Sequence, residues 1–192
     1  MTALDLHAVR LRTQRLELRA PRVSEAEALA DFVFRNRQQH ARWEPAREED
    51  YFRTPWWRDH LGFLGQEVRA GRTAPFVGFS REDGALLLRA NLSNVVRGAF
   101  HSAYLGFAVD AAHEGRGLAF EGVGEVVRFA FEELGLHRLQ ANHRPENERS
   151  AALLQRLGFR REGLAADYLH IDGAWRDHVM TAKLNPDWQA PD

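Results

Sequence analysis

Hydrophobic and polar positions along the chain repeat with two periods, which predict strands and helices. LRTQRLELRA alternates apolar and polar positions at Leu11, Leu16 and Leu18, and Pro21 closes this run, which predicts a first strand. Asp83-Gly84 and a second Asp-Gly pair are typical hairpin turns between strands. The other six predicted strands are APFVGFS, ALLLRANLS, HSAYLGFAVD, HRLQANH, LAADYLHI and AWRDHVMTAKL.

Four segments have the spacing of amphipathic helices. Ser24 and Glu27 form a capping-box pattern at the start of SEAEALADFVFRN, and Thr54 with Pro55 starts TPWWRDHLGFLGQEVRAG. NERSAALLQRLGF predicts a short helix that ends at Gly158. ARWEPAREEDYF predicts a loop between the first two helices. The long segment LAFEGVGEVVRFAFEELG has an apolar face made of Phe120, Val123, Val127, Ala130, Phe131 and Leu134.

The order of predicted elements is β α α β β β α β α β β. A strand–helix–strand crossover in its second half requires two parallel neighbours, whereas the hairpins are antiparallel. We therefore expect an α+β fold with a mostly antiparallel, mixed, seven-stranded sheet and about four helices. No repeat or linker divides the chain, so residues 1–192 are expected to form a single domain.

Composition narrows the function classes. The chain has 192 residues, of which 44% are hydrophobic, and it contains no cysteine, which excludes disulfides, thiolate metal sites and cysteine nucleophiles. Its net charge of −1 argues against direct DNA binding. No apolar run reaches membrane-spanning length and the first residues do not resemble a secretory signal. We therefore expect a cytoplasmic protein without membrane association.

The stretch EGRGLA, from Glu114 to Ala119, lies between a predicted strand and the long helix. Two glycines at a helix start have two explanations. One is a tight turn, and the other is a site where an anion approaches unpaired backbone N–H groups. The stretch matches neither the P-loop nor the dinucleotide-binding fingerprint.

The same stretch resembles the Q/R-x-x-G-x-G/A pyrophosphate loop of the GNAT family of N-acetyltransferases. NHRPENERSAALLQRLGFRREG resembles the second signature of that family. RWEP, YLGFAV and DYLHIDGAWRDHVMTA resemble its branch of ribosomal-protein alanine N-acetyltransferases, and the similarity runs from Thr13 to about Trp188, with a core of residues 13–188. Two positions depart from the family pattern: Glu114 replaces glutamine or arginine, and Leu88 replaces a frequent glycine.

The resemblance implies a site for acetyl-CoA, in a fold whose fourth and fifth strands splay apart. The pantetheine arm would pair with the backbone of the fourth strand, and a Val109 N–H would stabilise the oxyanion. Arg144 and Arg149 would meet the 3′-phosphate. The implied coenzyme-binding residues are Phe107, Ala108, Val109, Gly115, Arg116, Gly117, Leu118, Ala119, Asn142, Asn147 and Ser150.

The implied catalytic residues are Ser150, as proton donor to the leaving thiolate, and Asp167, as base for the amine. The alternatives are a first-turn helix serine and a surface carboxylate, and Asn147 also fits a helix N-cap. Glu162, His170 and His101 are further candidates for the base. Acceptor recognition is assigned to Trp43, Glu44, Asn91, Asn94 and Tyr168.

The implied reaction is direct acetyl transfer, through a tetrahedral intermediate, to the N-terminal α-amine of a ribosomal small-subunit protein, with alanine as the acceptor residue. That substrate is compatible with a ribosome contact, and the enzyme is expected to be a monomer or homodimer. A free amino acid, polyamine, lysine or drug amine remains an alternative acceptor. A coenzyme-binding or ribosome-assembly module with little turnover is the alternative of another class. The histidines make no metal-ligand pattern, so no metal is expected.

Overall fold

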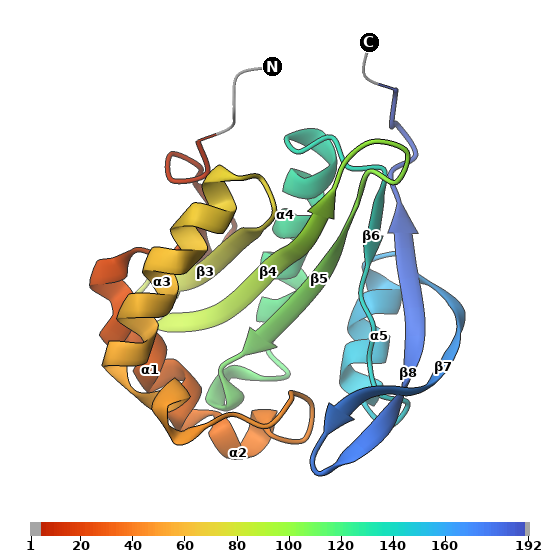
Figure 1. The fold of residues 1–192 in the computed structure, drawn as a ribbon. Helices are drawn as coiled ribbons and strands as arrows, with labels where there is room; N and C mark the ends of the chain where they lie inside the picture. The colour runs from red at the N-terminus through yellow and green to blue at the C-terminus, as the bar shows by residue number, and fades with distance from the viewer. Residues whose placement is uncertain (1–4, 191–192) are drawn as a thin grey trace.

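The computed structural model describes residues 5–190 and consists of one eight-stranded sheet with helices on both faces (Figure 1). The strand order is β1-β2-β3-β4-β5-β6-β8-β7. In chain order the elements are β1 (Leu11–Arg12), β2 (Leu16–Arg19), η1 (Val23–Glu25), α1 (Ala26–Arg35), α2 (Arg37–His40), η2 (Glu49–Phe52), α3 (Thr54–Arg69), β3 (Ala74–Ser80), β4 (Leu86–Val96), β5 (Ser102–Val109), η3 (Ala111–His113), α4 (Leu118–Glu132), β6 (Arg138–Gln140), α5 (Glu148–Arg156), β7 (Arg160–Ile171) and β8 (Ala174–Leu184).

The expected α+β class and mixed sheet are confirmed. β5 and β6 are the parallel pair, connected through α4, and the other neighbouring strands of the sheet are antiparallel. Both Asp-Gly pairs form hairpin turns, between β3 and β4 and between β7 and β8, and the glycines Gly84 and Gly173 have positive φ angles. This backbone conformation favours glycine because it has no Cβ.

The expected count of seven strands is wrong by one, because the first predicted strand is a short hairpin. β1 pairs with β2 so that Leu11 faces Leu18. Thr13 closes the turn: its N–H donates to the Leu16 carbonyl, and its Oγ1 accepts from the Leu16 N–H at 2.9 Å. Local side-chain bonds of this kind compete with a continuous strand.

Three helix predictions also need correction. Residues 5–190 form five α-helices because the four-residue α2 precedes the predicted loop. The capping box at Ser24 and Glu27 is wrong, since the carboxylate of Glu25 instead accepts from the Arg22 N–H at 2.8 Å, and η1 precedes α1. In α4, Phe120 is exposed and lies under the Arg156 guanidinium, while Val126 and Phe129 join the buried face.

Each face of the sheet has its own hydrophobic core. On one face, α4 with its buried Phe129 packs against buried residues of β2, β4 and β5, including Leu18, Leu92 and Leu105. α1 and α3 cover the other face, where Trp57 and Phe32 belong to a second cluster (Figure 1). β3 and β4 contribute buried residues to both clusters, so this part of the sheet is covered on both faces and supports the neighbouring β5.

Leu88, which departs from the family pattern, is fully buried between two glycines. A Cβ at Gly122 of α4 would lie 2.3 Å from Leu88 Cδ2, and one at Gly78 of β3 would lie 3.0 Å from Leu88 Cβ. Gly122 thus leaves the space that the leucine side chain fills. This departure is accommodated by core packing.

Candidate active site

β5 and β6 are paired over a short length and then separate. Their parallel register covers Ser102 to Tyr104 of β5, whereas β5 continues to Val109 along β4 (Figure 1). The Asp110 N–H donates to the Leu87 carbonyl, so alternation along an antiparallel ladder directs the backbone of Ala108 toward β4. The N–H and C=O groups of Phe107 and Val109 therefore face the opening. The sequence resemblance expects a splay between the fourth and fifth predicted strands. These strands correspond to β5 and β6, and they diverge as expected.

The chain after β6 forms the opposite wall of the opening. The Ala141 N–H donates to the Thr181 carbonyl, and His143 exchanges two backbone hydrogen bonds with Val179. Because these two residues face β8, alternation turns the backbone N–H and C=O of Asn142 toward β5. Both walls thus present hydrogen-bonding backbone groups to a chain laid between them.

The loop between β5 and α4 supplies a run of backbone donors. Gly115 and Gly117 have φ angles of +73° and +80°, and Gly117 is the N-cap of α4. Within residues 5–190, no protein acceptor receives a hydrogen bond from the backbone N–H groups of residues 115–120. A helix N-terminus also carries partial positive charge. The loop is therefore suited to an anion such as a diphosphate.

Asp110 fixes the start of this loop. Its carboxylate is almost fully buried and accepts from Arg35 Nε at 2.6 Å, Asn36 Nδ2 at 3.2 Å, the Ala112 N–H at 3.1 Å and His113 Nδ1 at 3.0 Å. Burial raises the pKa of Asp110, but the hydrogen bonds from His113, Arg35 and Asn36 outweigh it and lower the pKa to about 2. The end of α1 is thereby anchored to the loop.

A second anchor lies at the first turn of α4. The carboxylate of Glu121 accepts from the Arg15 backbone N–H at 2.6 Å, from the Arg15 side chain at 2.8 Å and from the Thr13 hydroxyl. Arg15 Nη1 also donates to the Arg116 carbonyl at 2.8 Å. Burial raises the pKa of Glu121, but these hydrogen bonds lower it overall. The β1–β2 turn thus supports the loop from outside.

α2 and the residues that follow it contact β5 and the loop before α5, a feature that the sequence did not reveal. His40 Nε2 donates to the Val109 carbonyl at 3.0 Å, so it lies on the cleft-facing edge of β5. Arg144, in the loop before α5, donates to the Arg42 carbonyl at 2.8 Å and lies 5.6 Å from the Trp43 ring. The predicted acceptor residue Trp43 is therefore held beside Arg144 and the loop before α5.

At the start of α5, Asn147 is the N-cap, and its Oδ1 accepts from the Ser150 N–H at 3.1 Å. The N-cap interpretation of Asn147 is confirmed, and it does not exclude a coenzyme contact. This bond fixes the Ser150 backbone, while the Ser150 hydroxyl makes no hydrogen bond with the described residues.

The structure brings two of the predicted residues together on the other side of the opening. Asn142 Nδ2 lies 3.5 Å from the Tyr168 hydroxyl, and its Oδ1 accepts from the Thr181 N–H at 3.2 Å. Burial and then the neighbouring Tyr104 raise the pKa of the Tyr168 phenol, so Tyr168 stays neutral. Tyr104 is a member of this cluster that sequence reasoning missed.

Asp167 lies next to Tyr168 at a β-bulge in β7. Its φ angle is +48°, and its N–H donates to Asp177 Oδ1 at 3.0 Å. Bulges redirect neighbouring side chains and are frequent beside active sites. The Asp167 side chain is exposed, so it is accessible to water.

Other predicted residues lie apart from this cluster. Asn94 and His101 are near the end of the β4–β5 pair that is remote from the splay, and Asn91 Oδ1 accepts from the Thr73 hydroxyl at 2.9 Å. Glu44 lies 4.0 Å from Arg47. Hydrogen bonds from Arg138 lower the pKa of Glu162 and hold it in an ion pair, and His170 is exposed beside Trp175. Among the base candidates, Asp167 alone adjoins Tyr168.

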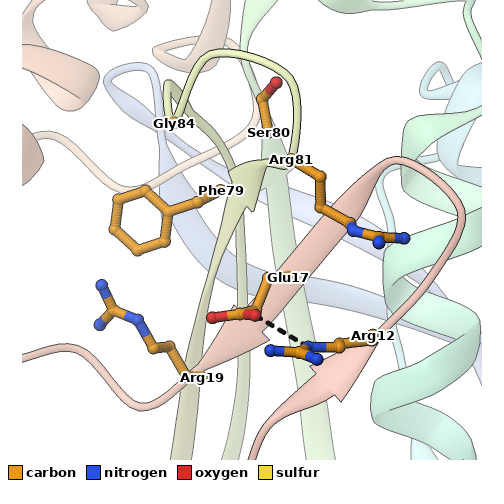
Figure 2. Close-up of a pocket in the computed structure, with 7 residues that line it drawn as sticks. All are labelled: Arg12, Glu17, Arg19, Phe79, Ser80, Arg81 and Gly84. Atoms are coloured by element: carbon orange, nitrogen blue, oxygen red, sulfur yellow. Dashed lines mark hydrogen bonds and ion pairs between the residues drawn. The ribbon is translucent and has the colours of Figure 1, made fainter.

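A surface cavity of about 560 Å³ lies away from this site, at the β1–β3 side of the sheet (Figure 2). Its arginines already have protein partners: Arg12 pairs with Glu17 at 3.0 Å, and Arg81 donates to the Thr13 carbonyl at 2.8 Å. Residues 5–190 contain no group of three or more histidine, aspartate and glutamate side chains able to hold a metal ion. Over the same residues, no helix combines the length and apolar character of a membrane span.

A splayed parallel strand pair, followed by a glycine loop with free N–H groups at a helix start, defines a class of acyltransferase. The family model of the acetyltransferase (GNAT) domain matches residues 15–160. The chain belongs to the GNAT family of N-acetyltransferases.

The chain is 42% identical over 180 residues to ribosomal protein uS5 alanine N-acetyltransferase of Escherichia coli, covering 94% of this chain and 93% of that protein. The crystal structure of ribosomal-protein-S5-alanine acetyltransferase from Vibrio fischeri matches with a TM-score of 0.91 and 32% identity, over 95% of this chain and 100% of that chain. Mycobacterium smegmatis RimJ in complex with CoA-disulfide matches with a TM-score of 0.85 and 34% identity, over 92% of this chain and 86% of that chain.

Proposed function

We propose that this chain is an acetyl-CoA-dependent enzyme that acetylates the N-terminal α-amine of a ribosomal small-subunit protein, with alanine as the acceptor residue. The observation that carries the proposal is the 42% identity to the Escherichia coli uS5 alanine N-acetyltransferase over nearly the full length of both chains. This relative favours a protein N-terminus over the amino acid, polyamine, lysine and drug alternatives. We place the enzyme in the cytoplasm, and take residues 1–192 as one domain with its core at 13–188.

The geometry of the site supports acetyl-CoA as the co-substrate. The N–H groups of residues 115–120 have no protein acceptor among residues 5–190, and they suit a diphosphate. The cleft-facing backbone of Phe107 and Val109 is suited to the amides of a pantetheine arm, because both can form strand-like hydrogen bonds. Asn142 faces that strand edge from the opposite wall. The RimJ relative from Mycobacterium smegmatis was solved with a CoA-disulfide.

In this proposal, acetyl-CoA supplies an acetyl group activated as a thioester, and the side chains and amides of the enzyme orient the reactants. The Val109 N–H is the donor to the carbonyl oxygen, where negative charge develops. Ser150 delivers a proton to the departing sulfur, directly or through a water. Asp167 takes the proton from the amine, whose unperturbed pKa of about 7.7–8.0 requires only a modest base.

Acceptor binding is assigned to the two sides of the cleft. Trp43 and Glu44 follow α2, and Tyr168 lies on β7. The carboxylate of Glu44 draws in a cationic N-terminus, and Tyr168 walls the reacting end as a neutral phenol. Asn91 and Asn94 are both kept in the proposal. Asn94 is the weaker candidate, since it lies near the end of the β4–β5 pair remote from the splay, whereas Asn91 lies opposite Gly106.

Thiol release from acetyl-CoA tests this function. The purified chain is given a peptide with N-terminal alanine, the same peptide with its α-amine blocked, free amino acids and a polyamine. Turnover is expected with the free α-amine peptide and not with the blocked one. Equal thiol release with and without the peptide, or faster release with a polyamine, would contradict the proposal. Mass spectrometry of ribosomal proteins with and without this chain then identifies the acceptor.

The diphosphate loop has a separate test in Gly117. Gly117→Glu and Gly117→Ala share the strain of a side chain at φ +80° and differ in charge. An alanine Cβ would meet only Arg15 Nη2, at an ordinary 3.5 Å. Calorimetry is expected to show no CoA binding by Gly117→Glu and measurable binding by Gly117→Ala. Equal affinities of the two variants would remove the loop from the site.

A further inference from the structure

Glu114 stands directly before the first loop glycine, where a carboxylate is unexpected beside a diphosphate site. Two residues from distant segments bind it. Arg149, in the first turn of α5, donates from Nη1 to Oε2. Gln39 of α2 places its Nε2 at 3.3 and 3.2 Å from the two carboxylate oxygens. The carboxylate thus joins α2, the loop and α5 at one point.

This ion pair is poorly suited to stabilising the fold. The Arg149 side chain is 76% exposed, and exposed pairs contribute little to stability because water and salt screen them. An arginine held in one position on the surface still has a use as a binding group. Its guanidinium has five N–H donors, and a carboxylate engages at most two of them. The remaining donors are available to an anion.

We propose that Arg149 is a ligand for a phosphate group of the coenzyme, and that Glu114 is the positioning residue that holds its guanidinium beside the diphosphate loop. The inference rests on the proposed function, because it requires that residues 115–119 bind CoA. Glu114 is bonded to Gly115, so a guanidinium on its carboxylate lies within one side-chain length of the free N–H groups. Arginine is the side chain best matched to phosphate oxygens.

The proposal predicts whether removing the charge of Glu114 tightens or weakens CoA binding. A carboxylate that merely lies near a diphosphate repels it, so Glu114→Gln would tighten CoA binding. A carboxylate that positions a phosphate-binding arginine has the opposite effect, because its loss frees a long side chain to sample many rotamers. We therefore expect Glu114→Gln to weaken CoA binding although it removes a negative charge.

The test is calorimetry of the full chain with CoA in a double-mutant cycle. Arg149→Ala is expected to weaken binding about tenfold, as for loss of a charge-assisted hydrogen bond. Glu114→Gln is expected to weaken it about threefold in the parent, and to tighten it in the Arg149→Ala background, where the carboxylate has no arginine to position and only repels the diphosphate. Unchanged or tighter binding by Glu114→Gln in the parent, or an equal loss in both backgrounds, overturns the positioning role. Unchanged binding by Arg149→Ala overturns the whole inference.

Matched controls separate this inference from other causes. Arg149→Lys keeps the charge and is expected to recover part of the affinity. Arg156→Ala, on the same helix with its guanidinium over the Phe120 ring, is expected to bind CoA like the parent. Thermal midpoints of all variants are expected to match the parent. Dephospho-CoA, which lacks the 3′-phosphate, identifies the phosphate that Arg149 binds. If Arg149→Ala weakens the binding of dephospho-CoA less than the binding of CoA, Arg149 binds the 3′-phosphate. If it weakens both equally, Arg149 binds the diphosphate. A parent chain that binds no CoA would contradict the proposed function itself.

Discussion

Replacing Asp110 by asparagine tests how the loop is anchored. The side chain of Asp110 is 5% exposed, and asparagine keeps its size but loses the charge that Arg35 and His113 engage. The pKa falls from the ordinary 3.8 to about 2, and each unit corresponds to about 1.4 kcal/mol. The charge therefore contributes about 2 kcal/mol to the free energy of unfolding. In Asp110→Asn, the Arg35 guanidinium still has the Leu86 carbonyl and the Asp31 carboxylate as partners, so it is not left unpaired.

The sign of the pH dependence follows from the direction of the pKa shift. Because the pKa of Asp110 is lower in the folded chain than in the unfolded chain, its contribution is complete above about pH 5 and is lost as the pH falls toward 2. The difference between the parent and Asp110→Asn is expected to be about 2 kcal/mol at pH 7 and pH 5, and about 1 kcal/mol at pH 3.

Urea unfolding followed by tryptophan fluorescence at these pH values measures the difference directly. Asp59→Asn serves as the control, since Asp59 is exposed on α3 and accepts no hydrogen bond from the described residues. We expect this control to match the parent at each pH. A parent–variant difference below about 0.5 kcal/mol at pH 7, or one that persists undiminished at pH 3, would refute the role assigned to Asp110.

Three further outcomes are expected. Gly122→Ala should lower the free energy of unfolding by about 1–3 kcal/mol, because its Cβ would lie 2.3 Å from Leu88 Cδ2. Gly124→Ala, with its nearest contact at 3.5 Å, should be neutral or raise that free energy by up to about 1 kcal/mol in the same urea assay, because alanine favours a helix interior. Ser150→Ala should lower kcat more than KM, since the backbone N–H that Asn147 caps is retained; an unchanged kcat in steady-state assays would leave water as the proton donor. Asp167→Asn should slow turnover most at low pH, where more amine is protonated, and a pH–rate profile identical to the parent would reject Asp167 as the base.

Local sequence signals were sufficient for most of the fold. Period-two and helical patterns predicted β3, β4, β5 and α4, and the Asp-Gly pairs marked both hairpins, because these elements depend on residues close in the chain. The signals failed where a hydrogen bond of one polar side chain sets the backbone, as at the turn between β1 and β2 that Thr13 closes. Periodicity also misassigned Phe120, since the apolar stripe of α4 continued one turn past the covered surface.

Prediction of the site was limited for a different reason. The glycines of the loop are visible in the sequence, but the groups that hold it come from far away: Arg35 reaches Asp110 across 75 positions, and Arg15 reaches Glu121 across 106. No local motif encodes such contacts. Tyr104 and His40 were missed for the same reason, because only the tertiary fold brings them to the cleft.

The two departures from the family pattern, Leu88 and Glu114, also depend on contacts between residues that are far apart in the chain. Leu88 fits because Gly122 leaves space for it, and the charge of Glu114 is met by Arg149. In each case the compensating residue lies more than 30 positions along the chain, so either substitution examined alone would suggest a damaged core or a weakened coenzyme site. Each departure is therefore compensated within a pair of residues, Leu88 with Gly122 and Glu114 with Arg149. It follows that the effect of substituting one member should be compared with the effect of the same substitution when its partner has already been replaced.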